Sequence, residues 1–110
     1  MCTRGDPLCD LGTVLAVWYD SDEVAASLNP MPTLAPGFLD RSEAAARYGE
    51  QSGRDLSRLP YYLVFGTFKM AVVLQQIYFR FHNGQTQDAR FASMGEGAKS
   101  LFRLADARRP

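Results

Sequence analysis

Polar and basic side chains line up in one part of the sequence, the apolar stretch formed by residues 61–81. Read at helical spacing, one row of this stretch mixes a small residue with polar and basic ones. The row consists of Tyr62, Gly66, Lys69, Val73, Gln76 and Arg80. If the stretch is a helix, these side chains share one face. That face is the place where the sequence gathers groups able to do chemistry.

Arrangements typical of a catalytic or metal-binding site are missing elsewhere. The single histidine, His82, lies at the end of the apolar stretch, which is typical of a capping or packed histidine rather than the base of a nucleophile pair. Asp20, Asp22 and Glu23 indicate a solvated acidic loop, because no glycine-spaced calcium loop surrounds them. A glycine-rich phosphate loop is also absent from the sequence. We therefore expect no metal site and no complete catalytic site.

Length, charge and cysteine content set the class of protein. With 110 residues, 46% of them apolar, the chain is expected to form a single helical domain or subdomain over residues 1–110. Its 12 basic and 12 acidic residues cancel, which argues against a nucleic-acid partner. Cys2 and Cys9 have no second cysteine pair beside them, so zinc spacing is absent and free intracellular thiols are expected.

The sequence also carries an expectation about location. The first residues lack the basic start and apolar run of a secretory signal, so we expect a cytoplasmic protein. Residues 61–81 are long enough to span a bilayer, but they include Lys69, Gln75, Gln76 and Arg80, which are costly in hydrocarbon. The stretch is therefore predicted to be a buried helix of a soluble protein without membrane contact.

The segments that must position these residues have helical patterns, and about four helices are expected. Asp6 and Pro7 mark the start of a first helix over residues 7–19, because Asp6 can cap free N–H groups and Pro7 has no N–H to leave unpaired. Several prolines predict an irregular loop over residues 20–38. No segment has a convincing strand pattern, so the predicted fold class is all-α.

A second helix is predicted for residues 40–51. Asp40 and Glu43 have the spacing of a capping box, and Gly53 is suited to end the helix. The connection to the following helix is short, so these two helices are expected to be neighbours.

The longest helical pattern covers residues 61–83 and is expected to be central. It carries two apolar rows, which helices on both sides should cover. One row is Tyr61, Phe65, Phe68, Val72 and Phe79, and the other is Leu63, Met70, Leu74, Ile77 and Phe81. A last helix is predicted to begin near residue 88, with Asp88 as its cap.

An ordered set of motifs spans nearly the whole chain and resembles a known family. The most specific motif is Gly5-Asp6-Pro7-Leu8-Cys9-Asp10-Leu11-Gly12. It is similar to the Gly-Asp-Pro-Leu-x-Asp-Leu-Gly signature of aminoglycoside-phosphotransferase-like kinases, which have a protein-kinase-like fold. Later similarities, in chain order, are Ser52-Gly53-Arg54-Asp55-Leu56-Ser57, Phe68-Lys69-Met70-Ala71-Val72 and Gly84-Gln85-Thr86-Gln87-Asp88-Ala89-Arg90-Phe91. The chain looks most like the kinase-like domain fused to certain acyl-CoA dehydrogenases.

The resemblance implies the C-terminal helical part of an enzyme that uses ATP and magnesium to phosphorylate a small-molecule hydroxyl. In the family, the nucleotide loop, the phosphate-binding lysine, the His-Gly-Asp-type catalytic loop and the Asp-Trp-Glu-type magnesium motif all precede this segment. None of them is in the sequence. The chain alone is therefore expected to hold no catalytic residue and no cofactor, and Met1 is interpreted as an internal methionine of a longer frame.

The resemblance also assigns roles to individual residues. Asp6 would cap the first helix, and Asp10 would brace the catalytic loop of the missing core. Tyr62, Lys69, Gln76 and Arg80 would help to wall the cleft for the acceptor substrate. Two cations on that wall suit an anionic or CoA-linked acceptor better than a cationic aminoglycoside.

A structural interpretation of the same row stays open. Lys69 and Arg80 can extend their stems over apolar neighbours, or pair with acidic groups such as Asp10 or Asp20. Tyr62 can be a packed core residue.

Two functional alternatives follow. The chain is the substrate-side part of a kinase whose core is a separate or preceding segment, or it is a non-catalytic helical interaction module derived from that fold. A helical protein unrelated to these kinases is the third alternative.

Overall fold

The computed structural model describes residues 4–20 and 31–110. Within these ranges the chain is all-α, with four α-helices, two short 3₁₀ helices and no strand, as predicted. The elements are α1 (Pro7–Ala16), η1 (Pro32–Leu34), α3 (Arg41–Ser52), α4 (Leu59–His82), η2 (Ala89–Ser93) and α5 (Met94–Ala107).

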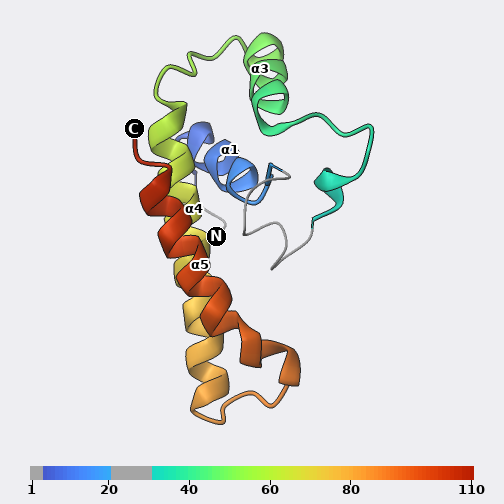
Figure 1. Ribbon diagram of the computed structural model, residues 1–110. Coiled ribbons are helices and arrows are strands. Elements are labelled where there is room, and N and C mark those ends of the chain that lie inside the picture. The colour runs from blue at the N-terminus through green and yellow to red at the C-terminus, as the bar shows by residue number, and fades with distance from the viewer. Residues whose placement is uncertain (1–3, 21–30) are drawn as a thin grey trace.

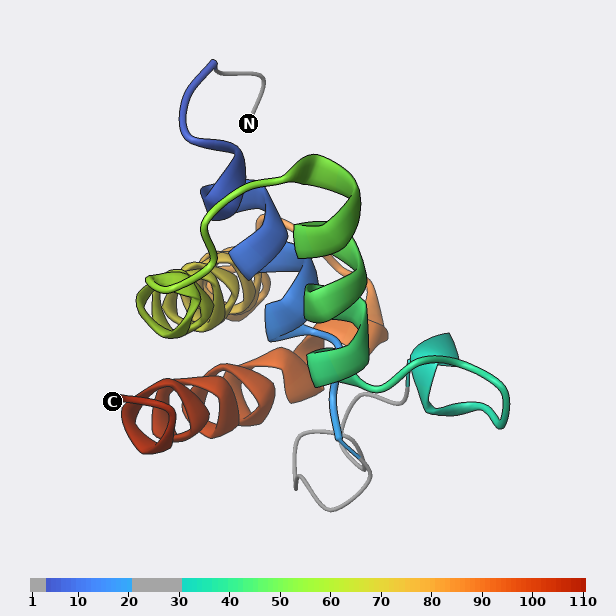
Figure 2. The same cartoon turned by 90° about the horizontal axis from the view of Figure 1, so that it is seen from above.

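The long helix α4 is central, and α1 and α5 both pack against it. Helix α5 runs back alongside α4, whereas α1 crosses α4 near its N-terminal half (Figures 1 and 2). The molecule measures 47 × 34 × 24 Å along its principal axes. The prediction that the longest helix is central is therefore confirmed.

The local signals that begin and end helices act as predicted. The carboxylate of Asp6 accepts a hydrogen bond of 3.0 Å from the backbone N–H of Leu8, and proline stands in the first turn of α1. Asp40 and Glu43 form a reciprocal capping box, with both hydrogen bonds at 2.8 Å. Gly53 ends α3 with φ at +67°, a conformation that favours glycine.

Three helix boundaries differ from the prediction. Helix α1 ends at Ala16 instead of residue 19, because the chain turns there and the indole N–H of Trp18 donates to the carbonyl of Leu39 over 2.9 Å. Helix α4 begins two residues earlier than expected. Asp88 caps η2 rather than α5, so α5 starts at Met94, after five residues of 3₁₀ helix.

The crossing of α1 and α4 depends on two glycines. A Cβ atom on Gly12 would lie 2.3 Å from the carbonyl oxygen of Tyr62, and one on Gly66 would lie 2.4 Å from the carbonyl oxygen of Gly12. Any larger residue would force the helix backbones apart, so the missing side chains allow this close contact. The small residue of the polar row thus lies under α1.

Arg108, at the C-terminal end of α5, connects all three packed helices. Its guanidinium donates to the carbonyl oxygen of Ala16 at 3.1 Å and to the hydroxyl of Thr67 at 2.8 Å. Thr67 is fully buried, and its own hydroxyl donates to the carbonyl of Leu63 within α4. The positive charge lies at the C-terminal end of α1, where the helix dipole favours it.

The expectation that both apolar rows of α4 are covered is wrong for one of them. The row that starts at Leu63 is half-buried against neighbouring helices. In the other row Tyr61, Phe65, Phe68 and Phe79 are exposed. Val72, the remaining member of the row, is half-buried, and Phe102 of α5 lies edge-on against Phe68, so α5 reaches one edge of this row and leaves its rings largely exposed.

Helix α3 is also placed differently from the prediction. It was expected beside α4, but it packs on no described helix as extensively as α1 and α5 pack on α4. Its first turn is held mainly by Arg41, whose guanidinium forms an ion pair of 2.7 Å with Asp20 and donates to the carbonyl of Trp18. The prediction relied on the short connection, which does not by itself fix the direction of a helix.

Candidate functional site

The residues singled out in the sequence lie on α1 and α4. Asp6 and Asp10 belong to the start of α1, and Tyr62, Lys69, Gln76 and Arg80 follow one another along α4. The structure brings Asp6 together with Tyr62, and Gln76 together with Arg80. It does not gather all six residues into one site.

Tyr62 and Asp6 are joined by a short hydrogen bond from the phenol to a carboxylate oxygen. This bond, together with the backbone N–H of Leu8 and the positive charges of Arg54 and Arg58, lowers the pKa of the Asp6 carboxyl. The same bond to Asp6 raises the pKa of the Tyr62 phenol. The pair therefore holds the start of α1 on the first turns of α4, which is a structural role.

Asp10 lies in the first turn of α1, and its side chain is exposed. It forms no hydrogen bond or ion pair with a residue that the structure describes. Val14, one helical turn further on, is exposed as well. Because α1 packs on α4 through the side that carries Gly12, Asp10 and Val14 belong to a part of its surface that α4 leaves open.

Lys69 and Arg80 form no ion pair within the described ranges. Pairing with Asp10 or Asp20, the interpretation left open above, is therefore not observed, and Asp20 binds Arg41 instead. Gln76 and Arg80 line a shallow hollow of about 390 Å³ with polar and apolar walls. Its other lining residues are Gln75, Phe79 and Gln85.

The polar row of α4 is thus divided into two halves. Its N-terminal half, with Tyr62 and Gly66, forms the contact with α1. Its C-terminal half, with Gln76 and Arg80, faces solvent. Only the second half is available as the wall of a cleft.

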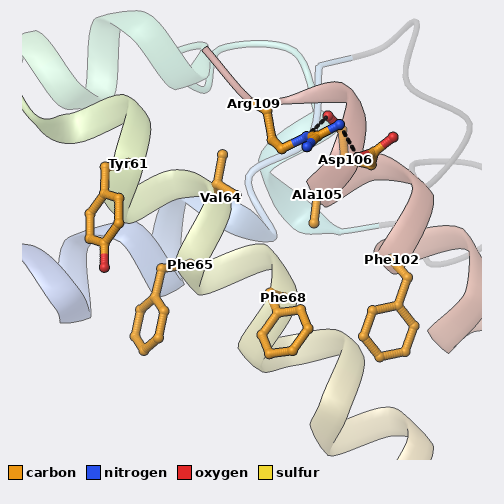
Figure 3. A pocket seen from close by; sticks show the side chains of 8 residues that line it. All are labelled: Tyr61, Val64, Phe65, Phe68, Phe102, Ala105, Asp106 and Arg109. Atoms are coloured by element: carbon orange, nitrogen blue, oxygen red, sulfur yellow. Dashed lines mark hydrogen bonds and ion pairs between the residues drawn. The ribbon is translucent and has the colours of Figure 1, made fainter.

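A larger hollow of about 430 Å³ lies between α4 and α5 (Figure 3). The sequence did not predict this hollow. Aromatic rings line it from both helices, and the ring of Phe68 meets that of Phe102 edge-on with centroids 5.6 Å apart. An ion pair of 2.7 Å between Arg109 and Asp106 lies on its rim. The aromatic spacing on α4 was visible in the sequence, but only the packing of α5 shows that this row faces solvent.

The remaining candidate groups do not assemble into a site. His82 is exposed at the end of α4, with its ring centroid 5.9 Å from that of Tyr78. Cys9 is a free, half-buried thiol, whereas Cys2, Asp22 and Glu23 lie outside the described residues. Across residues 4–20 and 31–110, no three side chains are grouped so that they could hold a metal ion.

Comparison of the chain with protein-family models, with curated proteins and with solved structures finds no match. The resemblance to kinases described above therefore rests on the sequence motifs alone. By length and composition alone, α4 is also long and apolar enough to cross a membrane.

Proposed function

We propose that this chain is the substrate-side helical part of an aminoglycoside-phosphotransferase-like kinase. In this proposal it acts together with a kinase core that binds ATP and magnesium, and the core transfers phosphoryl to the hydroxyl of a small, anionic acceptor. The chain alone has neither a phosphate-binding loop nor the carboxylates that hold magnesium in such enzymes, so it is inactive in isolation.

The observation that carries the proposal is the open surface of α1 at Asp10. In the family the corresponding aspartate braces the catalytic loop, and here its carboxylate is exposed and makes no hydrogen bond with a described residue. The exposed Val14 beside it supplies an apolar contact for the same docking. A core seated on this face would desolvate both side chains and give Asp10 its partner.

The cations of α4, the half-buried Lys69 and the exposed Arg80, support the acceptor class. Lys69 and Arg80 are not neutralised by a described carboxylate, so their positive charge is available to an anion. Helix α4 itself contains no aspartate or glutamate over its 24 residues.

A chimera tests the proposal. The nucleotide-binding core of an acyl-CoA-dehydrogenase-associated kinase, up to and including its Asp-Trp-Glu motif, is joined to residues 1–110, and ATP consumption is followed with hydroxyacyl-CoA as acceptor. We expect transfer that requires both parts, and a loss of at least ten-fold in kcat when Asp10 is replaced by alanine. A folded chimera that binds ATP but transfers to no hydroxyl acceptor would refute the proposal.

The second candidate, a non-catalytic interaction module, is favoured by a different observation. Arg108 and the Gly12–Gly66 contact connect α1, α4 and α5 through contacts within this chain. Light scattering separates the two candidates. A module is monodisperse or forms a defined dimer, whereas a part taken from a larger enzyme associates without a fixed size.

A further inference from the structure

Four exposed aromatic side chains lie along one face of α4, three on successive turns and the fourth three turns further on; we call them the aromatic strip: Tyr61, Phe65, Phe68 and Phe79. The exposed fractions of these four residues range from 43% to 59%. Their helical spacing places them on one face, and at 1.5 Å per residue the strip is about 27 Å long. Four large rings in one line are an apolar surface of the kind that marks a binding site.

Helix α5 widens the strip. Phe102 lies against Phe68, and the hollow of about 430 Å³ continues from these two rings towards Tyr61. In Figure 3 the rings of Tyr61, Phe65, Phe68 and Phe102 project to the same side of the two helices. The apolar surface therefore follows two neighbouring helices instead of one.

The charges that α4 and the residue before it place beside the strip are positive, whereas α5 contributes the Arg109–Asp106 ion pair on the rim of the hollow. Lys69 lies one helical turn after Phe65, and Arg80 shares a hollow with Phe79. Arg58 lies just before α4, with its guanidinium 5.7 Å from the centre of the Tyr61 ring. No acidic residue occurs in α4 to balance these cations. The strip thus combines exposed rings with a cationic flank.

Exposed rings beside positive charges indicate which kind of partner the strip would bind. A second copy of the chain would bring two cationic flanks together, which opposes association. The surface of an anionic bilayer offers phosphate and carboxylate headgroups to the cations and an apolar boundary to the rings. Aromatic residues are also the side chains enriched at membrane interfaces.

We propose that the aromatic strip docks this chain on the surface of an anionic membrane, with α4 lying parallel to the bilayer plane. The charged residues that argued against a buried membrane span lie beside the strip, so a surface position leaves them among the headgroups. In the most apolar window of α4, 22% is buried within the molecule and further residues are half-buried, so the exposed rings of the strip are the part of this helix open to lipid.

Vesicle co-sedimentation tests this proposal. The full chain is mixed with vesicles of phosphatidylcholine and phosphatidylserine, and in parallel with vesicles of phosphatidylcholine alone. We expect binding to the anionic vesicles that weakens with added salt. Because one basic residue near such a surface contributes about five-fold in affinity, Lys69→Gln and Arg80→Gln should each weaken binding by about five-fold.

Variants of exposed rings provide the matched comparison. Phe65→Gln with Phe79→Gln should weaken binding by about ten-fold, because both rings lose apolar contact with lipid. Phe38→Gln and Arg47→Gln change an equally exposed ring and an exposed cation away from α4, and should leave binding unchanged. Circular dichroism confirms that each variant is folded.

Three results would overturn the proposal. The first is equal binding to neutral and anionic vesicles, or binding to neither. The second is binding that the strip variants do not weaken. The third is a dimer in light scattering that Phe65→Gln with Phe79→Gln converts to a monomer, which would assign the strip to a second copy of the chain.

Discussion

The phenol of Tyr62 on α4 donates a hydrogen bond to the carboxylate of Asp6, which itself caps α1. One carboxylate therefore serves two purposes, because it satisfies the first turn of α1 and fixes that turn on α4. The resemblance to kinases gave these residues separate roles, a helix cap and a wall of the substrate cleft. Their direct contact makes them a structural pair.

The pair should give the unfolding equilibrium a recognisable pH dependence. The folded state lowers the pKa of Asp6 through the bond from Tyr62, so the associated stability is present above the ordinary value of 3.8 and is lost as pH falls below it. The folded state raises the pKa of Tyr62 through the bond to Asp6, so that contribution is present below pH 10.0 and is lost as pH rises further.

Tyr62→Phe should remove the alkaline loss of stability and bring the pKa of Asp6 closer to 3.8. Urea denaturation across the pH range measures the first effect, and carboxyl NMR titration measures the second. Tyr48→Phe, on α3, is the control and should change neither. An unchanged titration of Asp6 in Tyr62→Phe would contradict the hydrogen bond.

Substitution at the helix crossing should be far more damaging than at another helical glycine. Gly66→Ala places a methyl group 2.4 Å from the carbonyl oxygen of Gly12, so α1 must move away, and we expect a loss of about 1–3 kcal/mol or more. Gly97→Ala meets only the side chain of Leu74 at 3.4 Å, and should be neutral or stabilising by up to about 1 kcal/mol, because alanine favours helix. Chemical denaturation of the two variants checks the difference. Equal losses would mean that α1 does not cross α4 at this point.

The all-α class and several helix boundaries could be predicted because they depend on residues close together in sequence. Asp40 with Glu43, for example, lie within one helical turn of each other, and their reciprocal bonds are nearly independent of the rest of the fold. Which row of α4 faces solvent could not be predicted in this way. It depends on where α5 and α1 both pack on α4, and the crossing of α1 is set by Gly12 and Gly66, which belong to different helices.

The candidate site, too, could be predicted only in part from the sequence. Helical spacing correctly placed Tyr62 and Arg80 on the same helix, but it could not show that α1 covers the first half of their row. The position of Arg108 at the junction of three helices has no sequence signature either, because its partners are a backbone carbonyl and the hydroxyl of Thr67.

Arg108 should contribute more to stability than any exposed arginine of α5. Arg108→Ala removes charge-assisted hydrogen bonds to Ala16 and Thr67 and leaves a buried hydroxyl and a helix-end carbonyl with fewer partners, so we expect a loss of about 2 kcal/mol. Arg103 is exposed, and Arg103→Ala should stay within about 0.5 kcal/mol of the wild type. Thermal and urea denaturation report both values. A near-neutral Arg108→Ala would show that the three helices are held by apolar packing alone.

The capping box of α3 allows local and global stability to be separated. Asp40→Ala should weaken α3 by about 1 kcal/mol, because the N–H of Glu43 loses its acceptor. Helix α3 packs only lightly on the other helices, so this loss should remain largely within α3. Hydrogen exchange should therefore become about five-fold faster in the amides of α3 and stay unchanged in α4 and α5. Uniformly faster exchange in all helices would instead mean that α3 unfolds together with the core, and that its contacts through Arg41 contribute more than their small number indicates.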